Sequence, residues 1–140
     1  MALRQTLWAH LESPPAAEGA RHFIHPDQVG ALALVINELL TNAVKHRSVT
    51  SRPDGFAQGV AARCTVASSA SEAVLEIFNA GDGPDARSWD RFPPGVRGLG
   101  LAKALLPSRG AHLSFRTETG LVCARLQIGP PVWCPRVQST

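Results

Sequence analysis

A long amphipathic helix pattern dominates this sequence and limits the folds that it can adopt. Its hydrophobic residues recur at intervals of three and four positions: Leu32, Ile36, Leu39, Leu40, Ala43 and Val44. Pro26 and Asp27 suit its first turn, because proline needs no amide partner there and an acidic side chain is favourable at the positive end of the helix dipole. We therefore predict a helix over residues 27 to 47 with one face in the hydrophobic core.

Three polar residues lie along one side of this predicted helix. Glu38, Asn42 and Lys45 follow one another at spacings of four and three, which places them on one edge. An ordinary solvated stripe would explain them, but the almost uninterrupted apolar stretch beside them favours a recessed edge. A buried amide or carboxylate without a partner costs about 1–3 kcal/mol. A phosphate chain and a magnesium ion are suitable partners, because Mg²⁺ prefers oxygen ligands and an asparagine side-chain carbonyl is one.

Two glycine clusters follow the helix pattern. NAGDG, at residues 79–83, comes directly after a predicted strand, and GVRGLGL, at residues 95–101, opens a predicted second helix. Glycine lets a backbone approach a ligand closely, and the free N–H groups at a helix N-terminus bind phosphate. A turn would explain the first cluster, and a loop-to-helix junction the second. The helix edge and both clusters in this order together indicate a phosphate-binding site.

The remaining patterns predict the fold class. Strands are predicted over residues 21–25, 59–66, 73–79, 111–118 and 121–128, with a hairpin turn at Thr119-Gly120. The second helix is predicted over residues 98–110, ending near Pro107, and the proline-rich stretch RSWDRFPPG is predicted to be irregular. This order predicts an α/β (α+β) two-layer sandwich, with one mixed β-sheet and helices on one face. We divide the chain into a lead-in (1–20), one domain (21–128) and an irregular tail (129–140).

Composition excludes several classes of function. The net charge is +3 and the basic residues are dispersed, so we expect no nucleic-acid partner. Three cysteines form no CxxC pair, which argues against a zinc site and favours the reducing cytoplasm. No apolar run approaches the roughly 18 residues of a membrane span. We therefore expect no direct membrane contact in this chain, and any anchor of a larger parent protein would lie outside it.

Three motifs carry a resemblance to a known family. ALALVINELLTNAVKH resembles the N-box of histidine kinases with an NELxTNAxKH pattern, and FNAGDGP resembles the first glycine box, usually DxGxG. GVRGLGLAKALL resembles the second glycine box, usually GxGLGL followed by a helix. Over roughly residues 21–128, the chain is thus similar to the GHKL superfamily of ATP-binding domains, which have the Bergerat fold. It most resembles the catalytic domain of a sensor histidine kinase.

The resemblance implies a role for each motif residue. Glu38 would be catalytic, polarising the attacking group or a water, and Asn42 would ligate a Mg²⁺ ion that bridges the ATP phosphates. The residues implied in phosphate contact are Lys45, His46, Arg97, Gly98, Leu99 and Gly100. Of these, Gly98 and Gly100 would act through their backbone N–H groups, and Arg97 lies next to the segment that would form a lid over the nucleotide. The residues implied at the adenine end are Asn79, Gly81 and Gly83. Asn79 departs from the family pattern, because an acid is usual there and an uncharged amide makes a weaker hydrogen bond.

The implied activity is transfer of the ATP γ-phosphate by a protein-histidine kinase of two-component signalling. The phospho-acceptor histidine would lie on a separate dimerisation domain, which would pass the phosphoryl group to a response regulator. The lid, over residues 84–96, would be small and stiff because it is short and rich in proline. Two alternatives remain: a standalone serine kinase of the anti-sigma-factor type, and a non-catalytic nucleotide-binding regulatory module, which the amide at position 79 favours.

Overall fold

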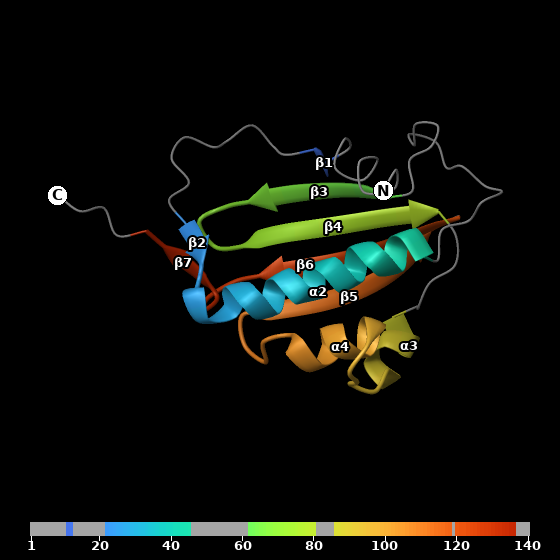
Figure 1. The fold of residues 1–140 in the computed structure, drawn as a ribbon. Helices are drawn as coiled ribbons and strands as arrows, with labels where there is room; N and C mark the ends of the chain where they lie inside the picture. Colours follow the sequence, from blue (N-terminus) through green and yellow to red (C-terminus); the bar gives the residue numbers. More distant parts are fainter. Residues whose placement is uncertain (1–10, 13–21, 46–61, 81–85, 119, 137–140) are drawn as a thin grey trace.

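The protein folds as a two-layer α/β sandwich, as the sequence predicts. The computed structural model describes residues 11–12, 22–45, 62–80, 86–118 and 120–136. Its main sheet has five strands: β1 (Leu11–Glu12), β3 (Arg63–Ser68), β4 (Ala73–Ala80), β5 (Ala111–Glu118) and β6 (Leu121–Ile128). Their order is β1-β3-β4-β6-β5, with β1 parallel to β3 and the other pairs antiparallel. The sheet is therefore mixed, and helix α2 crosses one of its faces (Figure 1).

The two predicted helices are present, and a third was not predicted. Helix α2 (Pro26–Lys45) matches the prediction for residues 27 to 47 up to its last described residue, and α4 (Gly98–Leu105) ends shortly before Pro107. Helix α3 (Ala86–Arg91) lies in the stretch predicted to be irregular, so that prediction was wrong. The prolines of this stretch, Pro93 and Pro94, come after the last turn of α3, where they do not break the helix. None of the helices in the described part of the chain is long and apolar enough to cross a membrane.

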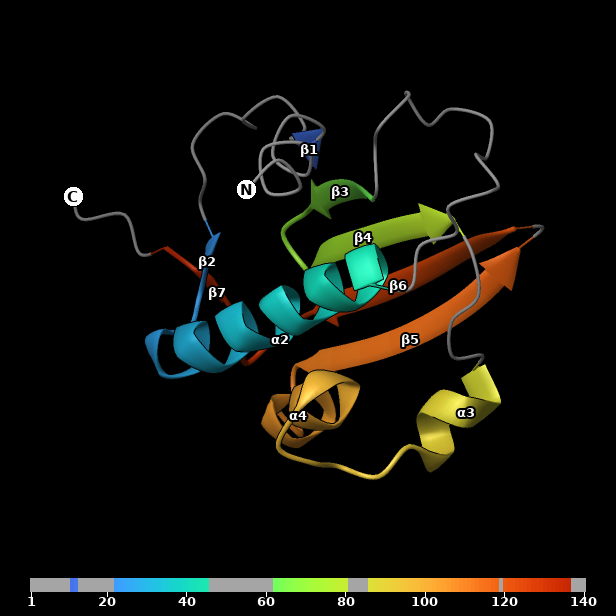
Figure 2. The same ribbon diagram turned by 45° about the vertical axis from the view of Figure 1, so that its right-hand side comes forward.

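A second, two-stranded sheet corrects the prediction of a single sheet and of an irregular tail. Strand β2 (His22–Ile24) pairs antiparallel with β7 (Trp133–Pro135), beside the first turn of α2 (Figure 2). The ring of His22 stacks on Trp133 at 5.4 Å between centroids, and Trp133 Nε1 donates a hydrogen bond of 3.0 Å to Ser69 O. These contacts join residues far apart in the sequence, so local patterns carried no signal for β7. The lead-in also contains β1, which is not among the predicted strands.

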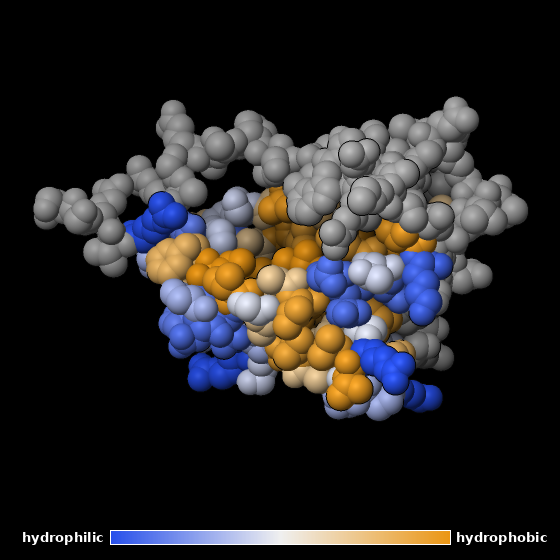
Figure 3. All heavy atoms as spheres, viewed as in Figure 1, coloured by the Kyte–Doolittle hydropathy of each residue, from blue (hydrophilic) through white to orange (hydrophobic). Residues whose placement is uncertain are grey.

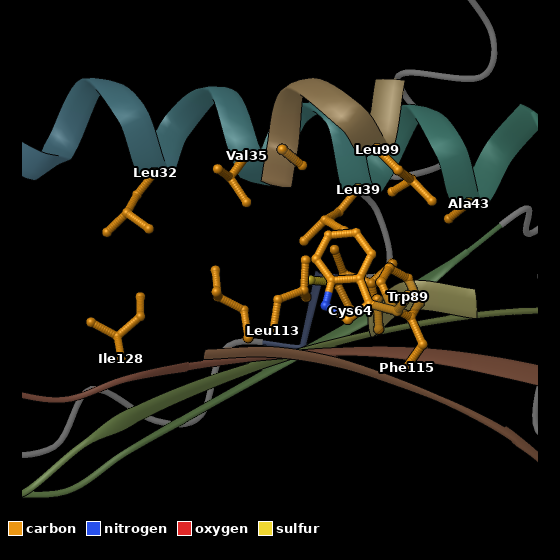
Figure 4. Packing of buried hydrophobic residues seen from close by; sticks show 14 of the residues in the cluster. Leu32, Val35, Leu39, Ala43, Cys64, Trp89, Leu99, Leu113, Phe115 and Ile128 are labelled. Atoms are coloured by element: carbon orange, nitrogen blue, oxygen red, sulfur yellow. The ribbon is translucent and has the colours of Figure 1, made fainter. Parts of the chain in front are cut away.

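The hydrophobic core lies between α2 and the inner face of the main sheet. Four residues at helical spacing face the sheet and are almost fully buried: Leu32, Val35, Leu39 and Ala43 (Figure 4). Opposite them, alternate residues of β4, β5 and β6 point inward, among them Ile77, Leu113 and Leu126. Helix α4 adds Leu99 and Ala102 to the same cluster. This packing fixes the rotation of α2 about its axis, and so fixes where its polar edge points.

Candidate functional site

Helix α2 places its polar edge on the flank of the buried face. Because Leu39 and Ala43 point into the sheet, Glu38 and Asn42 turn to one side, where both are half-buried. Lys45 is the last residue of the helix and is exposed, so the predicted recess holds for Glu38 and Asn42 but not for Lys45. Among the described residues, the side chains of Glu38 and Asn42 have neither a hydrogen-bond nor an ion-pair partner. Both are therefore available to a ligand.

Strand β4 ends in a buried amide. Asn79 is only 5% exposed and is the one polar residue in the buried class within the described ranges. Its Nδ2 atom donates a hydrogen bond of 3.2 Å to Ala80 O, which only the nitrogen end of the amide can do. Its Oδ1 atom, among the described residues, accepts no hydrogen bond, so an acceptor is left for an incoming group. Gly81 and Gly83 lie outside the described residues.

Helix α4 begins with an uncapped turn. Its N-cap residue, Arg97, is exposed and extended (φ −142°, ψ 157°), and no side chain caps the first amides. Gly98 has φ +54°, a conformation that favours glycine. Gly100 lies so close to Gly95 that a β-carbon on Gly100 would come within 3.1 Å of that backbone. The side chain of Leu99 packs in the core, so only its backbone N–H is left for a ligand.

The three elements meet at one end of the sandwich. Leu99, in the first turn of α4, belongs to the same buried cluster as Leu39 and Ala43, and Figure 4 shows the three side chains close together. Both ribbon views place the end of β4, with Asn79, beside the C-terminal end of α2 (Figures 1 and 2). Hydrophilic residues also gather over this half of α2 in Figure 3. His46 lies just past the described part of the helix.

Comparisons with known proteins support the fold. No protein-family model and no curated protein matches the sequence. Among solved structures, histidine kinase AdeS of Acinetobacter baumannii is 16% identical, with a TM-score of 0.50 over 73% of this chain and 47% of that one. The catalytic domain of histidine kinase ThkA, in a nucleotide-free form, is 12% identical, with a TM-score of 0.52 over 91% and 90% of the two chains.

A third similar structure is the blue-light activated histidine kinase EL346 of Erythrobacter litoralis, at 18% identity and a TM-score of 0.56 over 86% of this chain and 34% of that one. The chain has the fold of a histidine kinase catalytic domain. It spans about half of AdeS and about a third of EL346, but nine-tenths of the ThkA catalytic domain. In this histidine kinase fold, the described residues of the three sequence motifs lie on α2, on β4 and on α4 with the residues next to it.

A shallow cleft lies elsewhere on the histidine kinase fold. It encloses about 270 Å³ at the start of α2 and the end of α4, and its polar lining includes His25, Asp27 and Arg109. His25 Nδ1 accepts a 3.2 Å hydrogen bond from the Asp27 amide, so this helix start is already capped. None of the predicted site residues lines the cleft. The described residues also contain no group of three or more His, Cys, Asp or Glu that could hold a metal ion.

One residue with a structural role near the site was not predicted from the sequence. Lys103 of α4 reaches across to α3, where its ammonium group contacts Trp89 and Asp90. Lys103 is the one charged residue within GLGLAKALL, a helix whose other members are small or apolar. A single charged side chain in such an apolar helix indicates that the side chain has a fixed partner. The partner could not be named, because the sequence did not predict α3.

Two of the three thiols in this histidine kinase fold are held in their neutral form. Burial raises the pKa of Cys64 to about 11. Burial, together with a hydrogen bond that the thiol donates to Glu76 at 3.4 Å, raises the pKa of Cys123 to about 12. Their ordinary thiol value is 9.0. The unfolded chain therefore loses these protons first as the pH rises, and the folded state loses stability from about pH 9 upward toward these raised values.

We expect this loss to appear as a negative slope in stability above pH 9. The free energy of unfolding, measured with urea at pH 8, 9, 10 and 10.5, should fall slightly between the first two values and more steeply between the last two. A variant carrying both Cys64→Ala and Cys123→Ala lacks the two buried thiols and should show a shallower slope. Equal slopes in the two proteins would show that other groups cause the alkaline loss.

Proposed function

We propose that this chain is the ATP-binding catalytic domain of a two-component sensor histidine kinase. The observation that carries the proposal is the recessed pair Glu38 and Asn42, which has no partner among the described residues and lies on the half of α2 beside the first turn of α4. A carboxylate and an amide without protein partners keep their hydrogen-bonding groups available to a ligand. The fold, shared with histidine kinase catalytic domains, and the motif resemblance support the same conclusion.

The residues present fit magnesium-bound ATP. The uncapped N–H groups at the start of α4 suit phosphate oxygens, and at Gly98 no β-carbon hinders approach to the backbone. Gly100 is buried against Gly95, so the absence of a β-carbon there allows the two backbones to pack closely. Asn42 would hold Mg²⁺ through its side-chain oxygen, with Lys45 and Arg97 supplying positive charge to the phosphates and His46 a further phosphate contact. Bound ATP would supply the transferable γ-phosphoryl group. The side-chain oxygen of Asn79 would accept a hydrogen bond from the exocyclic amino group of adenine, and Gly81 and Gly83, outside the described residues, are proposed for the same end of the nucleotide.

Catalysis in this proposal rests on positioning and charge. Glu38 would orient the attacking group, because its carboxylate is half-buried and has no competing partner among the described residues. Phosphoryl transfer needs little covalent chemistry from the protein, so alignment and neutralisation of charge account for most of the rate. The phospho-acceptor histidine would be presented by a separate dimerisation domain, with a response regulator as the final recipient, in the cytoplasm.

The proposal is tested by binding and then by transfer. Mg-ATP and Mg-ADP should each raise the midpoint of thermal unfolding, because both bind the folded state alone. With radiolabelled ATP and a candidate acceptor domain, label should appear on the acceptor and be lost in acid, as phosphohistidine is. Acid-stable label would favour the serine kinase alternative, and binding without transfer to any acceptor would favour the regulatory module. No thermal shift with either nucleotide at millimolar concentration would contradict nucleotide binding altogether.

A further inference from the structure

Helix α3 lies between the two glycine clusters and is fixed to the sheet by an aromatic contact. Trp89 is only 6% exposed, and its ring lies 5.0 Å from the ring of Phe115 on β5 and 6.3 Å from that of Phe92 (Figure 4 shows Trp89 beside Phe115). Aromatic pairs at such distances attract one another beyond the effect of burying their area. The segment that leads to the second glycine cluster therefore starts from an anchored helix.

Lys103 joins this helix to α4. Its Nζ atom donates hydrogen bonds to Trp89 O at 2.6 Å and to Asp90 O at 3.2 Å, and it lies 5.1 Å from the centroid of the Trp89 ring. Trp89 and Asp90 belong to the last turn of α3, where the helix dipole is negative, and Trp89 O also accepts a hydrogen bond of 3.1 Å from the Phe92 amide. A cation there is favourable, and hydrogen bonds to charged groups are the stronger ones. One ammonium group thus makes three contacts with α3.

The other end of the connecting segment is also fixed. The Gly95 N–H group donates to Gly100 O at 2.8 Å, and the two glycine backbones touch. Residues 92–97 therefore run between two anchors, one at the end of α3 and one at the start of α4. Arg97 and Gly98, which are expected to meet the phosphates, follow directly from this segment.

We propose that Lys103 is a positioning residue for the nucleotide site. It clamps α3 to α4, so that residues 92–97 take their shape before a nucleotide arrives. This inference rests on the proposed function. Nucleotide binding then loses little conformational entropy in residues 92–97, because these residues are already ordered in the folded protein. Without the clamp, only a fraction of the molecules has the binding-competent shape, and the apparent affinity falls to that fraction of its former value.

Two variants of Lys103 separate the charge from the length of the side chain. Lys103→Met keeps the unbranched stem and removes all three contacts, whereas Lys103→Arg keeps a positive donor. Arg109→Met is the matched control, because it removes one positive charge from an exposed position just after α4. Hydrogen exchange of the Phe92 amide, which donates to Trp89 O at 3.1 Å, reports the last turn of α3. The Leu106 amide, bonded to Ala102 O at 3.0 Å, reports whether α4 stays intact.

In the nucleotide-free protein, Lys103→Met should speed exchange at Phe92 at least tenfold and leave Leu106 unchanged. Its Kd for Mg-ATP, by calorimetry, should rise roughly 3–10-fold, as expected if the competent shape falls to between about a third and a tenth of molecules. Mg-ATP should restore the protection of Phe92. Lys103→Arg should recover most of both effects, and Arg109→Met should show neither.

Unchanged exchange at Phe92 in Lys103→Met would overturn the clamp. An equal loss of affinity in Arg109→Met would reduce the effect to net charge, and faster exchange with unchanged Kd would leave Lys103 without a positioning role. Failure of the proposed function would give a different result: the wild-type protein would bind no nucleotide at all. Lys103 would then have no positioning role for a nucleotide. Exchange of the Phe92 amide would still show whether the contacts of Lys103 hold α3 to α4.

Discussion

Asn42→Ala should remove most of the thermal stabilisation that Mg-ATP gives to the wild-type protein. Asn42 is the amide expected to ligate Mg²⁺, and its half-buried side chain has no described partner whose loss would disturb the fold. At a hundredfold excess of ligand over Kd, binding stabilises the folded state by about 2.7 kcal/mol. A hundredfold loss of affinity would reduce that gain to about 0.4 kcal/mol. Differential scanning fluorimetry with and without Mg-ATP measures the change.

Thr41→Ala is the control, because Thr41 is exposed and adjacent on the same helix. It should keep the full shift. Chelation of magnesium should reduce the shift of the wild-type protein to that of Asn42→Ala and should change the variant little. An Asn42→Ala protein with an undiminished, magnesium-dependent shift would remove Asn42 from the site.

Gly110→Ala should destabilise the fold far more than Gly120→Ala. Both glycines have positive φ, +83° and +75°, so a side chain at either position costs about 1–2 kcal/mol. Around Gly120 there is open space. At Gly110, a β-carbon would meet Val132 Cγ2 at 2.8 Å, Gly129 O at 2.9 Å and Pro131 Cδ at 3.0 Å, and such overpacking adds about 1–3 kcal/mol.

Urea unfolding at constant pH measures the free energy of unfolding of both variants, and an unchanged slope m supports two-state behaviour. The difference between them isolates the clash from the backbone penalty, because their φ angles are nearly the same. Equal losses would mean that the turn after β6 moves aside to make room for the added methyl group. The turn would then not be as tightly held as its contacts indicate.

The parts of the fold that the sequence predicted correctly depend on local patterns. Helix α2 follows from the spacing of its apolar residues, and the β5–β6 hairpin follows from alternation and the glycine at position 120. Helix α3 and strand β7 were missed because distant contacts hold them: Trp89 packs on Phe115, and Trp133 stacks on His22. Sequence patterns carry no direct information about such pairs.

The candidate site was predicted mainly through the motif resemblance, and the structure adds what a motif cannot contain. Spacing alone placed Glu38 and Asn42 on one edge, but only the packing of Leu39 and Ala43 shows that this edge is half-buried. The burial of Asn79 and its bond to Ala80 depend on the sheet register. Lys103 was beyond sequence reasoning, because its partners are backbone carbonyl groups, which every residue has.

The small sheet of β2 and β7 also has a mechanical consequence. It brings the strand before α2 and the strand after β6 to a single corner, at the opposite end of α2 from Asn42 (Figure 1). A pull transmitted through either strand would act on this one corner. The domain would then swing about it as a rigid arm, and the end of α2 that carries Asn42 would sweep the widest arc.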